Sequence, residues 1–367
     1  MKKSTKKKII LIAGGTGGHV YPAISLSENL LKDPTKEVYY LTDKRGKKYF
    51  DQVESSFLYQ INSSSPYRKS RKETFLFPFK IFSGFIKSFV ILRRISPSVI
   101  IAFGGYTSIP PCLAGYILRI PIIIHEQNAI MGRANRLLSN FANNITVSFH
   151  NTKKIKLNFK DKITYVGLPL RNQIVKYRKS NFEYKRNKKL NILIIGGSQG
   201  SRAFTDIIPK VISYLPNSIR KEIKLFQNCN VDDEKILENI YSNLNIDHEI
   251  KNFFQDIGYY INQADLIIAR AGANTVFEIC TIGRASILIP LSTSIDSDQY
   301  HNASFLNDTG ASIFYDESVI NLNDFAKKLE LLFKDTIKIE QMAKHAYECN
   351  IDIGNRKFIE IIENNYL

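Results

Sequence analysis

Two glycine-rich turns, each directly after a short apolar run, are the residues of this chain best suited to chemistry. The first occupies 14–19 (G-G-T-G-G-H) after the run 8–13, and the second occupies 196–201 (G-G-S-Q-G-S) after the run 190–195. Each should present backbone N–H groups and a helix start at one point, which attracts phosphate. Two such turns, about half a chain apart, predict two similar halves with a nucleotide cleft between them; a tight turn without a ligand is the plainer alternative.

His19 closes the first turn and is the candidate for proton transfer. Neither turn has the G-x-G-x-x-G spacing of dinucleotide sites, although Asp43, after the run 38–41, keeps an NAD or FAD site open because an acid there can bind a ribose. An imidazole has no place in that fingerprint and titrates near neutral pH. A lone histidine is commonly structural, but one on a phosphate-type turn is expected to be functional.

Further polar clusters follow other apolar runs. They are F-G-G-Y-T-S at 103–108, H-E-Q-N at 125–128, R-A-G-A-N-T-V-F-E at 270–278, and a loop that brings Gln299 and Asn302 onto one helix face. In open α/β sheets ligands bind outside the carboxyl ends of the strands, so these clusters mark a site. Capping turns are the alternative, and the carboxylate of Glu278 could equally complement a helix dipole.

The elements that must position these residues are short, continuously apolar runs separated by stretches of helical length. Such runs are typical of parallel strands covered on both faces. Beyond the two strands that precede the glycine turns, we expect strands at 38–41, 99–103, 120–124, 145–147, 223–226, 266–269 and 285–289. The pattern predicts an α/β chain with a doubly wound fold that occurs twice.

Length and composition agree with two domains. A chain of 367 residues exceeds the roughly 250–300 residues that one core supports. We expect a first domain at 1–166, a charged linker at 167–189 and a second domain at 190–350. The net charge of +17 favours anionic partners, and a general compositional excess of lysine is the plainer alternative. Four widely spaced cysteines suit a reducing compartment, and no apolar run approaches the roughly 18 residues of a membrane span.

Taken in order, the motifs at 14–19, 103–108, 125–128, 196–201, 270–278 and 298–303 resemble the MurG family of UDP-N-acetylglucosamine:N-acetylmuramyl-(pentapeptide) pyrophosphoryl-undecaprenol N-acetylglucosaminyltransferases. The resemblance runs from about residue 8 to 345. It implies the GT-B architecture, two Rossmann-like doubly wound domains with an interdomain cleft, with a helix at 351–367 that packs back on the first domain. It also implies inverting transfer of N-acetylglucosamine to the muramyl 4-hydroxyl of lipid I, giving lipid II for peptidoglycan.

The resemblance also assigns roles to individual residues. It makes His19 the general base. It places the UDP-N-acetylglucosamine donor on Gly15, Thr16, Gly17, Asn128, Arg171, Ser198, Gln199, Phe254 (through its backbone), Ala273, Asn274, Thr275, Val276, Phe277, Glu278 and Gln299. From the polar clusters at the strand ends and the aromatic stretch described below, we expect the acceptor and membrane side at Tyr106, Thr107, His125, Glu126, Phe75, Phe77, Phe79 and Phe82. No cofactor or metal is expected, because backbone N–H groups and Arg171 could carry the charge of the leaving diphosphate.

Some residues depart from the family pattern. Phe226-Gln227-Asn228-Cys229 stands where H-Q-T-G is usual, 253–257 is a loose form of F-I-D-D-M, and Asp298 precedes Gln299 where His or Gln is common. These departures affect the details of uracil and sugar contacts.

The aromatic stretch 75–87 is flanked by basic residues, Arg68, Lys69, Arg71 and Lys72 before it and Arg93 and Arg94 after it. Such a stretch suits docking on anionic inner-leaflet phospholipid, whereas the plainer alternative is a core helix with solvated ends. A lipid acceptor requires some such surface. We therefore expect a peripheral protein on the cytoplasmic face of the bacterial inner membrane, with cell-wall synthesis proteins as possible partners.

Rival functions remain open at this point. A diacylglycerol glucosyltransferase would share the architecture but not H-E-Q-N or the first glycine turn. A nucleic-acid binder should ignore UDP-sugars and bind in a salt-sensitive manner, and an NAD-dependent dehydrogenase should bind NADH. We expect no nucleic-acid partner.

Overall fold

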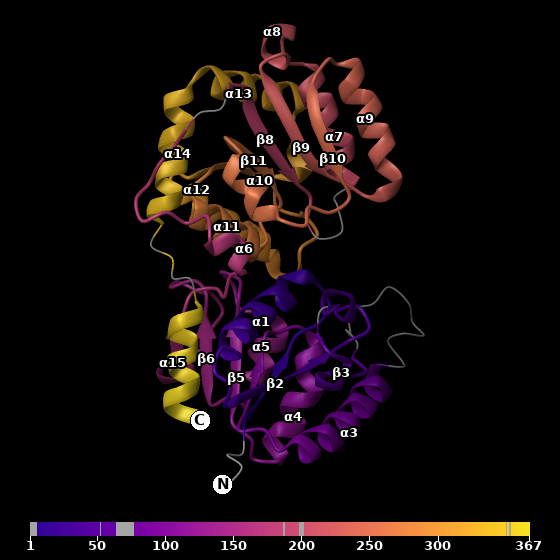
Figure 1. Cartoon of the computed structure of the whole chain (residues 1–367), viewed down its shortest axis with the longest axis vertical. Helices are drawn as coiled ribbons and strands as arrows, with labels where there is room; N and C mark the ends of the chain where they lie inside the picture. The colour runs from indigo at the N-terminus through magenta and orange to yellow at the C-terminus, as the bar shows by residue number, and fades with distance from the viewer. Residues whose placement is uncertain are drawn as a thin grey trace. The chain divides into compact units, whose positions relative to one another are not determined.

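The computed structural model describes residues 6–51, 53–63, 77–185, 188–197, 202–349, 351 and 354–367. The chain forms two compact units: unit 1 comprises 1–171 and 352–367, and unit 2 comprises 172–351 (Figure 1). The segment expected as a linker, 167–189, therefore divides at Arg171. Its second part contains α6 (Asn172–Val175), which packs against α10 (Ile257–Gln263) and α11 (Ala273–Ile282) of unit 2.

Unit 1 is built on a seven-stranded sheet of order β3-β2-β1-β4-β5-β6-β7, in which every neighbouring pair is parallel. Its strands are β1 (Lys7–Ile12), β2 (Lys36–Thr42), β3 (Leu58–Gln60), β4 (Val99–Ala102), β5 (Ile122–Glu126), β6 (Asn144–Val147) and β7 (Ile163–Tyr165). Every residue of β4 and β5 is buried. Burial on both faces explains why these strands are continuously apolar rather than alternating.

Helices cover both faces of this sheet. They are α1 (Gly17–Leu30), α3 (Phe77–Ile95), α4 (Ile109–Ile117), α5 (Arg133–Leu138) and α15 (Asn355–Tyr366), with 3₁₀ turns at Lys47–Tyr49, Ser55–Phe57, Tyr106–Ser108 and Leu157–Lys162. One core holds side chains of α3, α4 and α5, and the other holds side chains of α1 and α15. α15 thus joins the first half of the chain, where Phe358 and Ile362 are fully buried.

Unit 2 repeats this plan with a six-stranded parallel sheet of order β10-β9-β8-β11-β12-β13. Its strands are β8 (Leu190–Ile195), β9 (Ile223–Asn228), β10 (Asp247–Lys251), β11 (Leu266–Ala269), β12 (Ala285–Leu288) and β13 (Ser312–Phe314). Its helices besides α6 are α7 (Arg202–Ser213), α8 (Asn217–Arg220), α9 (Glu234–Asn243), α10 (Ile257–Gln263), α11 (Ala273–Ile282), α12 (Asp298–Asp308), α13 (Leu322–Lys334) and α14 (Thr336–Glu348), with 3₁₀ turns at Val231–Asp233, Ile295–Ser297 and Glu317–Val319.

The strand orders confirm the predicted doubly wound α/β fold in both halves. In each sheet the chain first winds outward to one edge, then returns to the centre and winds to the other edge. The direction reverses between β1 and β4 in unit 1 and between β8 and β11 in unit 2. Ligands of such sheets bind at the carboxyl ends of the strands beside this switch point, and both glycine turns begin there.

Candidate active site

The first glycine turn is held by a carboxylate beneath it. Asp43 follows β2, and its Oδ1 accepts hydrogen bonds from the N–H groups of Gly15 (2.9 Å) and Gly46 (2.7 Å). Gly15 has a φ of +82°, which a side chain would strain. Asp43 is buried, so its carboxylate anchors the turn rather than binding a ribose. Asp43, which the sequence analysis considered as a ribose ligand of a dinucleotide site, therefore has a structural role.

The start of α1 presents backbone to solvent. Thr16 is the N-cap residue in extended conformation, and its side chain makes no capping hydrogen bond. Thr16 is exposed, whereas Gly15 and Gly17 are buried. A helix start without a side-chain cap can turn backbone N–H groups toward an anion.

His19 lies in the first turn of α1 and is half-buried. Its Nδ1 is buried and has no hydrogen-bond partner among the described residues. The ring lies beside Gly105, which has a φ of +72°; a Cβ built there would lie 3.5 Å from the His19 Nε2. The turn at Gly104 and Gly105 therefore leaves room for the His19 imidazole.

Glu126 ends β5 and organises the loop that follows it. Its Oε1 accepts hydrogen bonds from the Asn128 N–H (3.0 Å) and Nδ2 (3.3 Å), and its Oε2 accepts from the Gly132 N–H (2.9 Å) and Asn135 Nδ2 (2.8 Å). Burial raises the pKa of the Glu126 carboxyl, while these hydrogen bonds and the nearby His19 charge oppose the rise. The carboxylate thereby fixes Asn128, which stays partly exposed.

His125 was expected to face the acceptor, but the structure places it in the core. The side chain is fully buried, and its Nδ1 and Nε2 lie 3.0 Å and 3.1 Å from the hydroxyls of Thr146 and Ser148. Its ring also packs against Phe103 and Phe358. Burial lowers its pKa to about 3, so it is a neutral core residue.

Two other expected acceptor residues lie in the 3₁₀ turn after Gly105. Tyr106 is half-buried, whereas Thr107 is buried with its Oγ1 3.3 Å from the Ser63 Oγ. Arg171, the last residue of unit 1 before the boundary, stacks its guanidinium 4.4 Å over the ring of Tyr21 in α1.

Unit 2 holds its glycine turn by the same device. Asn228 ends β9, beside β8; its Oδ1 accepts a hydrogen bond from the Gly196 N–H (2.8 Å) and its Nδ2 donates to the Gly197 oxygen (3.1 Å). Asn228 corresponds to Asp43 of unit 1, since each lies at the carboxyl end of the strand beside the one that leads into the glycine turn. Sequence reasoning gave it no role. Ser198 and Gln199 lie outside the described residues.

The segment 270–278 follows β11 and contains the start of α11. The N-cap residue is Gly272, which has no side chain to occupy the first N–H groups of the helix. Asn274 and Thr275 are half-buried, but Val276 and Phe277 are fully buried, so only the backbone of these two can meet a ligand. The remaining expected donor residues in and near this segment are also buried: Ala273, Glu278 and Phe254.

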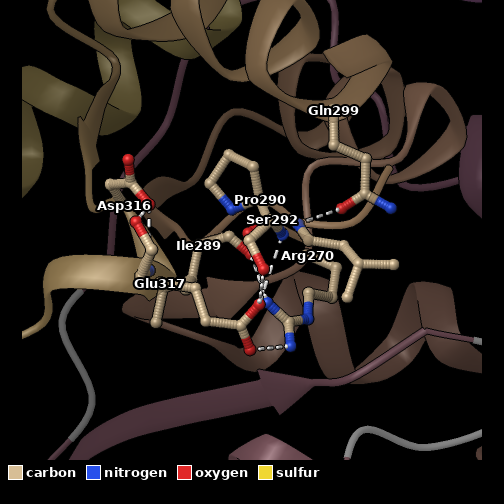
Figure 2. A network of polar contacts seen from close by, with 9 residues as sticks. Arg270, Ile289, Pro290, Ser292, Gln299, Asp316 and Glu317 are labelled. Carbon is tan, nitrogen blue, oxygen red and sulfur yellow. Dashed lines mark hydrogen bonds and ion pairs between the residues drawn. The ribbon is translucent and has the colours of Figure 1, made fainter. Parts of the chain in front are cut away.

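The loop after β12 leads to Gln299 at the start of α12. The Gln299 Oε1 accepts a hydrogen bond from the Leu291 N–H (3.0 Å), as Figure 2 shows. Asn302, expected to share a binding face with Gln299, is fully buried and donates to the Ala271 oxygen (3.0 Å). It is therefore a brace between α12 and the start of α11.

α3 carries an exposed apolar stripe. Phe79, Phe82, Ile86 and Val90 are 65%, 66%, 47% and 60% exposed, and their spacing of three or four residues places them on one face. Lys87, Arg93 and Arg94 are exposed on the same helix. Phe75 and the basic residues at 68–72 lie outside the described residues, and of Phe77 only the backbone is described.

Two features are absent from the described part of the chain. No helix there is both long and apolar enough to cross a bilayer. The same residues hold no group of three or more His, Cys, Asp or Glu side chains suited to a metal ion.

Comparisons with known proteins cover both units. The N-terminal domain model of glycosyltransferase family 28 matches residues 9–147, and the C-terminal domain model matches 191–359. The UDP-N-acetylglucosamine--N-acetylmuramyl-(pentapeptide) pyrophosphoryl-undecaprenol N-acetylglucosamine transferase of Rickettsia canadensis is 38% identical over 97% of this chain and 99% of its own. The protein of the same name from Paramagnetospirillum magneticum is 34% identical over 90% of this chain and 89% of its own.

Comparison with solved structures agrees with these sequence matches. The crystal structure of Acinetobacter baumannii MurG matches with a TM-score of 0.77 and 26% identity, covering 98% of this chain and 99% of that one. A UDP-GlcNAc 2-epimerase from Neisseria meningitidis, at 15% identity and a TM-score of 0.63, shares the fold alone. With both family models matched and 38% identity over almost its whole length, this chain belongs to glycosyltransferase family 28 and, within it, to the MurG family.

Proposed function

We propose that this protein transfers N-acetylglucosamine from UDP-N-acetylglucosamine to the muramyl 4-hydroxyl of undecaprenyl-pyrophosphoryl-N-acetylmuramyl-pentapeptide (lipid I), forming lipid II with inversion. The observation that carries the proposal is the 38% identity, over 97% of this chain, to a curated transferase of that name. The two switch-point turns support it, because a nucleoside diphosphate sugar needs backbone N–H groups at its diphosphate.

Unit 2 would bind the donor. The uncapped start of α11 offers N–H groups to the diphosphate, and Glu278, one turn into that helix, would accept the ribose hydroxyls. Gln299 would contact the sugar, and the backbone at Phe254 would meet the uracil. Ser198 and Gln199, which lie outside the described residues, are assigned to the nucleotide by the sequence resemblance. Val276 and Phe277 would contribute their backbone only.

Unit 1 would supply the base. In a single displacement, His19 takes the proton of the 4-hydroxyl, the resulting oxygen bonds to C1 of N-acetylglucosamine, and the bond from C1 to the UDP oxygen breaks. Negative charge then collects on the departing diphosphate. Backbone N–H groups at helix starts and the Arg171 guanidinium would carry it without a metal ion.

The reaction is tested by transfer of labelled N-acetylglucosamine from its UDP donor to a short-chain lipid I analogue in excess EDTA. Product that requires both substrates and survives EDTA supports the reaction and the metal-free mechanism. Product that EDTA abolishes would overturn the proposed role of Arg171 and the helix starts. Absence of product despite UDP binding would exclude lipid I as the acceptor.

The role of His19 needs a separate experiment. His19→Ala should reduce turnover by about 10²–10⁴-fold, the usual contribution of a general base, while the affinity for UDP-N-acetylglucosamine changes little. His150→Ala, an exposed histidine of the same unit, is the matched control. Turnover that survives His19→Ala nearly intact would exclude His19 as the base.

We also propose that the α3 stripe docks the protein on the cytoplasmic face of the inner membrane, where the undecaprenyl chain of the acceptor is embedded. Four exposed apolar side chains beside Lys87, Arg93 and Arg94 suit an anionic interface, to which each nearby cation contributes about 1 kcal/mol.

Cosedimentation with phosphatidylglycerol-containing vesicles tests the docking surface. The double substitution Phe79→Ser and Phe82→Ser should release the protein from vesicles, whereas Val319→Ser, at an exposed apolar residue of unit 2, should not. Equal binding by all three proteins would exclude α3 as the docking helix.

A further inference from the structure

A buried ion pair lies beneath the carboxyl ends of the unit 2 strands. Arg270 follows β11 and Glu317 follows β13, and the Arg270 Nη2 lies 2.5 Å from the Glu317 Oε1 (Figure 2). The two side chains are only 8% and 15% exposed. The guanidinium also stacks 4.7 Å over the ring of Phe204. The Arg270 charge is therefore largely removed from solvent, and the Glu317 charge is partly removed.

This pair fixes the chain that leaves β12. The Arg270 Nη1 donates to the oxygens of Ile289 (3.1 Å) and Pro290 (3.3 Å). The Glu317 Oε2 accepts from the N–H of Ser292 (3.3 Å) and lies 3.5 Å from its hydroxyl. Figure 2 shows these contacts meeting at the two charged groups. The ion pair therefore ties the start of the loop 290–297 to the ends of three neighbouring strands.

The loop beyond this anchor is partly exposed and has unusual backbone angles. Ser292 and Thr293 are exposed, and Asp296 and Ser297 have φ angles of 57° and 56°, which non-glycine residues rarely adopt. Gln299 follows directly, and its Oε1 is occupied by the Leu291 N–H. That hydrogen bond orients the amide so that its Nε2, which bonds to none of the described residues, can donate to a ligand oxygen.

We propose that Glu317 is a positioning residue for the transferred sugar: through Arg270 and the segment 289–292 it places the Gln299 amide to donate to a sugar hydroxyl. The proposal rests on the donor site described under the proposed function and deepens it. Glu317 itself touches no substrate. Its loss should therefore weaken recognition of the sugar while recognition of UDP remains.

The test compares calorimetric affinities for UDP-N-acetylglucosamine and for UDP in the full-length protein. Glu317→Gln keeps the shape of the side chain and removes its charge, and should weaken UDP-N-acetylglucosamine by about 3- to 10-fold, the range of one hydrogen bond, with UDP unchanged within about two-fold. Asp316→Asn, at the neighbouring exposed carboxylate that accepts from Ser318, is the matched control and should change neither affinity. Equal weakening of both ligands by Glu317→Gln would overturn the proposal.

A double-mutant cycle separates positioning from general destabilisation. Because Glu317 acts through Gln299, Glu317→Gln should add no further loss to Gln299→Ala; losses that multiply would overturn the proposal. Hydrogen exchange over 289–299 in the ligand-free protein supplies a readout that needs no donor. Faster exchange in Glu317→Gln is expected, and unchanged exchange would refute the bracing role even in a protein that binds UDP-N-acetylglucosamine.

Two further outcomes are distinguishable. Should Glu317→Gln fail to fold, because it leaves the Arg270 charge buried, Glu317→Asp keeps the charge and shortens the reach to Ser292 by one methylene, and the same ligand comparison applies. A wild-type protein that binds neither ligand would refute the proposed function, and this inference with it.

Discussion

Asp43→Ala removes the carboxylate that holds the first glycine turn, and its effect on unit 1 can be worked out from the hydrogen bonds. The substitution leaves the N–H groups of Gly15 and Gly46 without their acceptor in a buried position. Each such loss costs about 1–3 kcal/mol, so we expect about 4 kcal/mol in total. For a domain the size of unit 1 this lowers the unfolding temperature by about 8–16 °C.

Asp43→Asn separates the hydrogen bonds from the charge. Both N–H groups bond to Oδ1, and an asparagine keeps one oxygen that can accept from both. The expected loss is about 1 kcal/mol, or about 2–4 °C, because a neutral acceptor is weaker than a carboxylate. Asn228→Ala is the control in unit 2, where it removes the side chain that hydrogen-bonds the second glycine turn.

Differential scanning calorimetry of the full-length chain should resolve a transition for each unit, and hydrogen exchange over 13–18 would assign the affected one. Asp43→Ala should lower the unit 1 transition alone, and Asn228→Ala the unit 2 transition alone. If Asp43→Asn destabilises unit 1 as much as Asp43→Ala does, the charge rather than the hydrogen-bond geometry matters, and our account of Asp43 is refuted.

Three other substitutions in unit 1 test further features. Phe358→Ala removes a fully buried ring from α15 and should cost about 3–5 kcal/mol, visible as a lower unit 1 transition, while Phe253→Ala, at a half-exposed ring of unit 2, should change little. His125 has a folded pKa of about 3, below its unfolded value near 6.5, so only the unfolded chain binds the proton between these values. The contribution of neutral His125 to the free energy of unfolding is therefore fully present above pH 6.5 and falls by about 1.4 kcal/mol per pH unit below it. In His125→Gln, denaturant titrations should show a free energy of unfolding that falls less steeply as the pH is lowered. Gly105→Ala forces a side chain into a φ of +72° and places a methyl group beside His19, so turnover in the transfer assay should drop while UDP affinity holds; unchanged turnover would show that this turn does not shape the His19 site.

The central strands of both sheets could be predicted from the sequence, but their edges could not. The predicted apolar runs correspond to β1, β2, β4, β5 and β6 in unit 1 and to β8, β9, β11 and β12 in unit 2. The four strands that were not predicted, β3, β7, β10 and β13, are the outermost strands of the two sheets. An edge strand is short and pairs on one side only, so it needs no continuous apolar run; β10 reads D-H-E-I-K.

The candidate site shows a similar limit. Apolar runs that end in glycine locate the switch-point turns. They do not reveal which neighbouring polar side chains form hydrogen bonds within the protein and which face a ligand. The sequence suggested ligand binding by Asp43, His125 and Asn302, yet each forms hydrogen bonds with other residues of the protein. The clamp at Asn228 and the pairing of Arg270 with Glu317 depend on contacts across strands that are far apart in sequence.

The place of α15 has a consequence for biosynthesis. Unit 2 is an uninterrupted stretch of chain, whereas unit 1 is completed only by residues that the ribosome makes after all of unit 2. Until α15 is made, the hydrophobic surface that Phe358 and Ile362 will cover remains open. Domains generally fold as units during synthesis, so unit 2, although second in sequence, can finish first while the nascent unit 1 waits with that surface exposed. The nascent unit 1 therefore exposes this hydrophobic surface during the whole time in which unit 2 is synthesised.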